Sequence, residues 1–316
     1  MTRRRSAIGA AVGAAIGIAL LVYAVERVGL HEIVDGVKRV GWGFVVILAI
    51  AGARFVLRAQ CWRWCMPPSV QLDFRHAFSA FLAGDAVGNV TPLGLLASEP
   101  TKVLLTRHHL ATLDSVASLT LENVLYSISV MAVLAFGLGL LLATVAVPNA
   151  IWWVAVGSLV TMAAVAVTVI SVLRAPASSN GVATGWRAKL VRVRDEVGAF
   201  ARQHPGRLAR VFALQLFFHV LAVLETFITL RWLLGRQSPT VVQAIIFETV
   251  NRVTIVVFKF VPFRIGIDEA ASGAVAPLLA VTASAGVALA VIRKVRVLFW
   301  SAIGLMLVAA HPARRP

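Results

Sequence analysis

The sequence predicts an all-α integral membrane protein, with about six transmembrane helices plus two re-entrant hairpins in an inverted-topology repeat. Composition and the spacing of apolar runs predict this class. Hydrophobic residues make up 59% of the 316 residues and charged residues only 14%, whereas about 25% of a soluble domain is charged. One water-soluble core cannot bury this much apolar surface, because cores stop growing as chains lengthen. Lipid is therefore the expected solvent for most of the chain.

Six apolar runs approach the length of about 20 residues that a spanning helix needs. They cover residues 6–25, 40–62, 123–147, 151–173, 211–235 and 286–310, with approximate ends. The first run follows Thr2-Arg3-Arg4-Arg5, as the apolar part of a signal peptide does. Its length and the later spans favour a retained helix instead.

The formal net charge of +16 comes largely from basic residues in the segments between these runs. Lys and Arg beside membrane spans mark the cytoplasmic side, where they meet anionic lipid. We therefore expect both termini, the Arg58–Arg75 region and the basic loop 174–210 in the cytoplasm. The neutral connector 26–39 and the Pro148-Asn149 turn belong outside. Because no basic face exists apart from the loops, we expect no nucleic-acid partner.

Two remaining regions, about 76–110 and about 240–284, are apolar enough for membrane depth but are broken by Gly, Pro and charged residues. Non-helical backbone survives at that depth only where protein or a water-filled cavity covers it. We interpret both regions as re-entrant hairpins. Glu99 follows Pro92 by seven residues, and Glu269 follows Pro262 by seven. The shared order of two spans, a broken hairpin and a long helix favours an internal duplication.

The predicted repeats are residues 1–148 and 149–316. Three crossings lie between Pro92 and Pro262, and an odd number places the second hairpin on the opposite membrane face. Many secondary transporters contain inverted repeats of this kind, with their sites at the repeat interface. In an alternative topology, the uncharged run 270–292 is a full span, which gives seven or eight crossings.

Candidate binding residues lie around the hairpins and in the long helices that follow them, because ionisable groups at membrane depth usually face a bundle interior or a cavity. They are Asp85, Asn89, Pro92, Glu99, Lys102, Glu122, Asn251, Arg252, Lys259, Pro262, Arg264, Glu269 and Arg293, with Glu248 and Asp268 beside them. Gly84, Gly88 and Gly94 suit an unwound backbone that exposes amides to an anion. Solvation in interfacial loops is the simpler explanation. The recurrence of Glu99 and Glu269 in both copies favours a function for these two.

Several other residues have ordinary explanations. Arg54 and Arg58 share one helix face by their spacing of four, and positive-inside placement explains them better than a substrate contact. Glu122 opens a long uncharged helix, where the helix dipole favours an acid. Trp62 and Trp64 are typical of membrane-interface anchors.

Enzyme motifs are absent from the sequence, which has no His-Glu-x-x-His, no Gly-x-Ser-x-Gly and no Walker-type loop. Cys61 and Cys65 lack the second pair of Cys or His that a zinc site needs, so we assign them a structural role. We therefore expect no catalytic residue, no metal and no cofactor.

The segments Gly84-Asp85-Ala86-Val87-Gly88-Asn89-Val90-Thr91-Pro92-Leu93-Gly94 and Ser98-Glu99-Pro100-Thr101-Lys102 resemble a known family. It comprises flippase-like proteins related to the transmembrane region of lysylphosphatidylglycerol synthases. The resemblance covers nearly the whole chain and implies lipid translocation across a bacterial inner membrane. It assigns importance to Asn89, Pro92, Glu99, Pro262 and Glu269.

Two departures from this family matter. Ser98 stands where the family has Gly before the first Glu. The soluble aminoacyl-transferase domain of the two-part synthases is missing, so we do not expect this chain alone to lysylate lipid. A hopanoid-associated branch has a run similar to Thr91-Pro92-Leu93-Gly94, which makes hopanoids one candidate substrate.

From the resemblance and the repeat we expect a lipid transporter that works by alternating access. A phospholipid, a polyprenyl phosphate or a hopanoid would move between leaflets while Glu99 and Glu269 bind a proton or ion. Two other functions stay open. One is a membrane-embedded transferase that acts on a polyprenyl-linked substrate. The other is a non-catalytic scaffold that binds lipid-biosynthesis enzymes.

Overall fold

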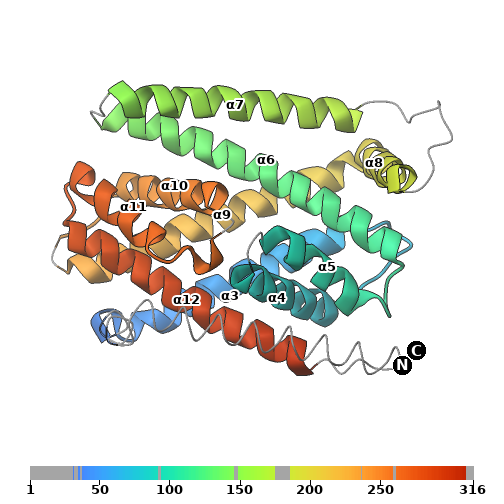
Figure 1. The fold of residues 1–316 in the computed structure, drawn as a ribbon, viewed down its shortest axis with the longest axis horizontal. Helices are drawn as coiled ribbons and strands as arrows, with labels where there is room; N and C mark the ends of the chain where they lie inside the picture. The colour runs from blue at the N-terminus through green and yellow to red at the C-terminus, as the bar shows by residue number, and fades with distance from the viewer. Residues whose placement is uncertain are drawn as a thin grey trace. The chain divides into compact units, whose positions relative to one another are not determined.

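A computed structural model describes residues 31, 35, 38–91, 94–145, 149–174, 186–235, 237–258 and 261–310. Throughout these ranges the regular secondary structure is helical (Figure 1). The predicted first span, Pro92, Lys259 and the arginines at both ends of the chain lie outside the described residues.

The helices lie close to the apolar runs from which they were predicted. The elements are α3 (Gly43–Trp64), α4 (Phe74–Val90), α5 (Gly94–Thr106), α6 (Thr112–Thr144), α7 (Asn149–Arg174), α8 (Trp186–Gln203), α9 (Pro205–Leu234), α10 (Val241–Val257), α11 (Ile267–Val275) and α12 (Ala283–Ala310), with 3₁₀ turns η1 (Pro262–Arg264) and η2 (Ala276–Leu279). Within the described residues, a helix lies in each predicted span from residue 40 onward.

Three of the described helices, α3, α6 and α9, are long and apolar enough to cross a membrane. Large apolar side chains on them point outward: Val45 of α3 is 54% exposed, Phe136 of α6 is 63% exposed and Val220 of α9 is 57% exposed. Water-soluble proteins rarely expose extended apolar surface, and such surface marks contact with a membrane or partner. The helices are therefore those of a membrane protein.

The chain forms two compact units. The first comprises the described residues up to Phe55, then Phe78–Leu105 and those from Leu221 onward; the second comprises the described parts of Val56–Ala77 and Thr106–Val220. The boundary between the units divides α3 after Phe55 and α9 after Val220, so each of these helices has one segment in each unit. Both regions predicted as hairpins belong mainly to the first unit. Each unit contains residues from both predicted repeats, so the units do not correspond to the repeats.

In the first unit, α4 and α5 pack closely through glycines. A Cβ atom at Gly88 would lie 3.1 Å from the carbonyl oxygen of Gly94, and one at Gly84 would lie 2.6 Å from the Lys102 side chain. Both Gly84 and Gly88 are inside the continuous helix α4. The unwound backbone expected at these two positions is therefore wrong, and the glycines instead permit close helix contact.

Around α10 to α12, the backbone is less regular than in α4 and α5. Helix α11 packs against α10 and α12, and the turn η1 between α10 and α11 places Phe263 at φ 51° and Arg264 at φ 48°. Left-handed backbone at a non-glycine residue costs about 1–3 kcal/mol. Burial of Phe263 against Val90 and Leu298 offsets part of this cost.

Two sequence interpretations of helix boundaries need correction. Helix α6 begins at Thr112, so Glu122 lies well inside the helix and does not benefit from its amino-terminal dipole. The uncharged run 270–292 is not one helix. It is divided among α11, η2 and α12, with Ala280 in the left-handed conformation.

The second unit is built on α6, which lies beside α7 and packs against α8 (Figure 1). Its buried cluster contains the free thiols Cys61 and Cys65, with Leu121, Leu125 and Val211. Trp62 is fully buried and donates its indole N–H to Ser118 Oγ at 3.0 Å. The prediction that Trp62 anchors the chain at a membrane interface is therefore wrong.

A buried ion pair links helices of the second unit. Arg58 donates through Nε to Glu122 Oε1 at 2.6 Å and through an Nη to Oε2 at 2.9 Å. Gln215 donates to the same Oε1 at 2.8 Å, and the Tyr126 ring lies 3.7 Å from the guanidinium carbon. Arg58 is thus an ion-pair partner inside the protein, a role that positive-inside placement does not account for.

We expect Glu122→Leu to lower the stability of the purified protein in detergent by about 3–5 kcal/mol, because Arg58 would keep its buried charge without the carboxylate. Thermal unfolding followed by tryptophan fluorescence measures this. The double variant Arg58→Leu/Glu122→Leu should be much closer to wild type, since an apolar pair replaces a buried ion pair at little cost. Equal losses in the single and double variants would contradict this account.

Candidate functional site

A group of buried arginines and glutamates lies within the first unit. We call it the arginine network, and it consists of Arg54 from α3, Glu225 from α9, Glu248 and Arg252 from α10, and Arg293 and Arg296 from α12. Its members lie up to 242 residues apart in the sequence, between Arg54 and Arg296. Apolar helices that meet at this point bring them together.

Each glutamate of the network accepts from two arginines. Glu225 Oε2 accepts from Arg54 at 3.0 Å and from Arg296 at 2.6 Å. Glu248 accepts from Arg252 at 2.9 Å through Oε1 and from Arg293 at 3.1 Å through Oε2. The two glutamates are therefore bridging groups that fix all four guanidinium groups.

Neutral polar groups complete the contacts. Arg293 donates to Thr226 Oγ1 at 2.7 Å, and Asn251 donates to Glu248 Oε2 at 3.2 Å. Because these partners carry no charge, they orient the ionised groups without changing the charge balance.

The network carries more positive than negative charge. Within the described residues, four arginines face two glutamates, and no side chain in the network is more than 14% exposed. Arg296 Nε is buried and has no hydrogen-bond acceptor among the described residues. A buried charge that the protein does not compensate is costly, so this arrangement favours binding of an anion.

Two lysine–glutamate pairs accompany the network in the first unit. Lys102 donates to Glu99 at 2.8 Å, and Lys294 donates to both oxygens of Glu269 at 2.6 and 2.8 Å. In each pair the lysine is buried, at 4% and 2% exposed, while the glutamate is 22% and 19% exposed. Both glutamates are thus partly exposed at the edge of the buried interior, although Glu99 Oε2 is itself buried and has no hydrogen-bond donor among the described residues.

The partner of Glu269 is Lys294 and not Arg264, although Arg264 lies much closer to it in the sequence. Arg264 instead donates to Asp268 at 3.2 Å, and Thr254 donates to the same Asp268 oxygen at 3.0 Å. The left-handed backbone of η1 and the start of α11 at Ile267 turn Asp268 toward Arg264 and Glu269 toward α12.

Asp85 and Asn89 are joined on α4. Asn89 donates to Asp85 at 3.0 Å, and its amide lies 3.4 Å from Ser301 Oγ of α12. The spacing of four residues places both on one helix face. These contacts connect α4 with α12 but do not include a residue of the arginine network.

The predicted candidates therefore fall into separate groups. Asn251, Arg252 and Arg293 belong to the arginine network or contact it, and Glu122 lies in the second unit. Sequence reasoning missed Glu225, Arg296, Lys294 and the ion-pair role of Arg54. The signal was present, because Glu225 interrupts an otherwise apolar span and Arg293-Lys294-Val295-Arg296 interrupts another.

Among the described residues, no group of three or more His, Cys, Asp or Glu side chains is arranged to hold a metal ion. The chemistry available in the first unit is that of guanidinium, ammonium and carboxylate groups. Guanidinium groups bind phosphate and carboxylate oxygens with paired hydrogen bonds.

Comparison with known proteins identifies the family. The model of the family described as the lysylphosphatidylglycerol synthase TM region matches residues 10–304. No curated protein and no solved structure matches the chain. The matched residues cover nearly the whole sequence and include both units. The chain belongs to the lysylphosphatidylglycerol synthase transmembrane region family, a family of membrane proteins associated with lipids.

Proposed function

We propose that this protein moves an amphipathic lipid with an anionic headgroup between the leaflets of a bacterial inner membrane. The observation that carries the proposal is the buried excess of arginine in the arginine network, where four guanidinium groups face two carboxylates. Membership of a lipid-associated family supports the same function.

The charge balance favours particular lipids. A phospholipid or a polyprenyl phosphate brings a phosphate that can replace water around the arginines while its tails stay in the bilayer. A hopanoid without a charged headgroup would leave the excess charge uncompensated, so we rank it below the other two. Glu225 and Glu248 hold the arginines in place when no lipid is bound. The phosphate of an arriving lipid would accept hydrogen bonds from the same arginines.

We expect Arg293→Gln/Arg296→Gln to slow the movement of a fluorescent phosphatidylglycerol by about tenfold or more, because two charge-assisted hydrogen bonds are lost. The substitutions remove the excess charge, yet Glu225 keeps Arg54 and Glu248 keeps Arg252. Purified protein in liposomes, with dithionite quenching of label in the outer leaflet, measures the rate.

Arg231→Gln is the matched control for this assay. Arg231 lies near the end of α9 and is exposed, and it donates to the carbonyl of Gly235 at 2.7 Å. It should transport at the wild-type rate. Absence of lipid movement by the wild-type protein would favour a scaffold or a transferase, and equal rates in all three proteins would exclude the arginine network as the headgroup site.

The proposed topology has six spans, two re-entrant hairpins that enter from opposite faces, and both termini in the cytoplasm. Helix α8 supports this orientation, because it carries five basic residues against Asp195 and Glu196, and basic amphipathic helices bind anionic membrane surfaces.

We expect a cysteine introduced as Gly185→Cys to react only from the cytoplasmic side, and Asn149→Cys to react from outside. The background variant is Cys61→Ala/Cys65→Ala, which removes the two buried thiols. Membrane-impermeant maleimide applied to intact cells and to inverted vesicles measures the accessibility. Labelling of position 185 from outside would overturn the orientation.

Coupling of transport to a proton or ion through Glu99 and Glu269 is the mechanism we propose. Each carboxylate accepts from a buried lysine, Glu99 from Lys102 and Glu269 from Lys294, and its negative charge would repel a passing anionic headgroup. Glu99→Gln and Glu269→Gln keep the size of the side chain but remove this charge, and we expect both to abolish the response of lipid movement to an imposed proton gradient in proteoliposomes. Glu99→Asp keeps the charge and should keep the response. If both Gln variants respond to the gradient as the wild type does, these carboxylates do not couple transport.

A further inference from the structure

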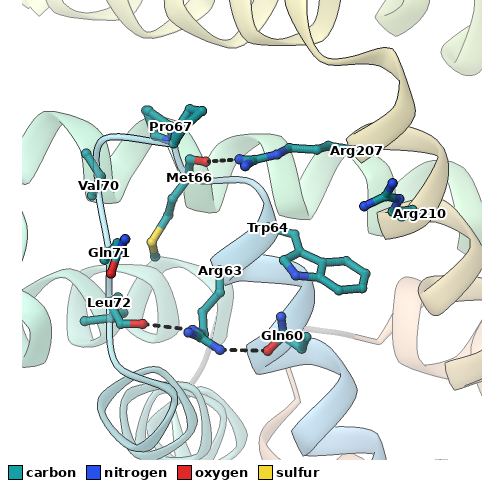
Figure 2. Close-up of a pocket in the computed structure, with 11 residues that line it drawn as sticks. Gln60, Arg63, Trp64, Met66, Pro67, Val70, Gln71, Leu72, Arg207 and Arg210 are labelled. Carbon is teal, nitrogen blue, oxygen red and sulfur yellow. Dashed lines mark hydrogen bonds between the residues drawn. The ribbon is translucent and has the colours of Figure 1, made fainter.

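A basic pocket lies in the second unit where α3 ends and α9 begins (Figure 2). Its volume is about 300 Å³. The lining comes from the last turn of α3, from the loop between α3 and α4, and from the first turns of α9. None of the lining residues belongs to the arginine network or to the lysine–glutamate pairs.

Three arginines line the pocket, and no lining residue is acidic. Figure 2 shows Arg207 and Arg210 on α9, with the loop residues Met66 and Gln71 on the other side of the view. Arg63 projects from the last turn of α3. The lining therefore carries three positive charges and no negative one.

Neutral acceptors hold two of the arginines. Arg63 donates through Nε to the Leu72 carbonyl at 2.8 Å and through Nη1 to Gln60 at 2.9 Å. Arg207 donates through Nη1 to the Met66 carbonyl at 3.2 Å. These contacts position the guanidinium groups without neutralising them, and among the described residues other nitrogens of both side chains remain for a ligand.

The nearest acid in the sequence does not alter this balance. Asp73 follows the lining residue Leu72, but its carboxylate accepts from the backbone N–H of Arg75 at 3.1 Å and lies 3.7 Å from His76 Nδ1. It is not part of the lining.

The pocket lies where two candidate membrane spans end. Helix α3 finishes at Trp64 and α9 starts at Pro205, and both are apolar enough to cross a membrane. The ends of spanning helices lie at the level of lipid headgroups, and tryptophan is enriched there. Half-buried Trp64 is part of the lining.

We infer that this pocket binds the phosphate of an anionic phospholipid headgroup from the surrounding leaflet, as a resident lipid rather than as cargo. Guanidinium groups match phosphate oxygens in geometry and charge, and basic pockets between spanning helices bind anionic headgroups. A volume of about 300 Å³ suits a glycerophosphate group, and the acyl chains can follow the apolar helix surfaces. The site belongs to the second unit and does not depend on the proposed transport.

Native mass spectrometry of the full-length protein in a neutral detergent tests the inference. The probes are phosphatidylglycerol, phosphatidylcholine as the zwitterionic lipid, and soluble glycerol phosphate. We expect Arg207→Gln/Arg210→Gln to weaken phosphatidylglycerol binding by about tenfold or more, since two charge-assisted contacts are lost. Arg231→Gln, on the same helix but away from the pocket, should bind as the wild type does.

The single variant Arg210→Gln guards against misfolding, because Arg210 is exposed and makes no ion pair with the described residues. It should retain the wild-type melting temperature and still lose several-fold in phosphatidylglycerol affinity. Phosphatidylglycerol binding that is unchanged in both variants would overturn the inference. Stronger binding of glycerol phosphate than of phosphatidylglycerol would also overturn it, since the site would then take a soluble phosphate ester.

Discussion

Ionised side chains in apolar helices are stable only with an opposite charge or a polar partner, and this constraint shapes both units. A charge moved out of water costs several kcal/mol unless it is paired. In the first unit, α3, α9, α10 and α12 meet where Glu225 and Glu248 hold four arginines. In the second, Arg58 and Glu122 join α3 to α6, and Gln215 adds α9. Polar contacts as well as apolar packing thus set the positions of the helices.

The sequence predicts only those pairs whose members lie close together in the chain. Glu99 and Lys102 are three residues apart, a spacing that brings side chains together on a helix, and they pair at 2.8 Å. Arg54 and Glu225 are 171 residues apart, and nothing in the spacing of either residue identifies the other. The same applies to Arg58 and Glu122, which are 64 residues apart. Arg54 and Arg58, explained from the sequence by positive-inside placement, therefore form ion pairs within the protein.

Helices were easier to predict than their ends. Length and apolar content predict where α3, α6, α7, α9 and α12 run, because an apolar run of about 20 residues favours a helix, whose backbone is internally hydrogen-bonded. Boundaries depend on weaker local signals. Helix α6 starts at Thr112, about ten residues before the uncharged run, and its first part includes the charged residues Asp114 and Glu122. The run 270–292 looks like one span by hydropathy, yet Pro277 and the left-handed Ala280 divide it. Proline lacks the N–H that a continuous helix needs.

The balance of charge distinguishes a structural ion pair from a group of charges that favours binding of a ligand. Arg58 and Glu122 match one to one, and Glu122 accepts three hydrogen bonds from protein groups. Such a pair requires no ligand to balance its charge. The arginine network is different, because within the described residues its four buried arginines share the carboxylates of two glutamates. Apolar side chains in place of the extra arginines would cost the fold less. Stability therefore does not explain Arg293 and Arg296 as a set, whereas the anionic headgroup that we propose for this site would supply further negative charge.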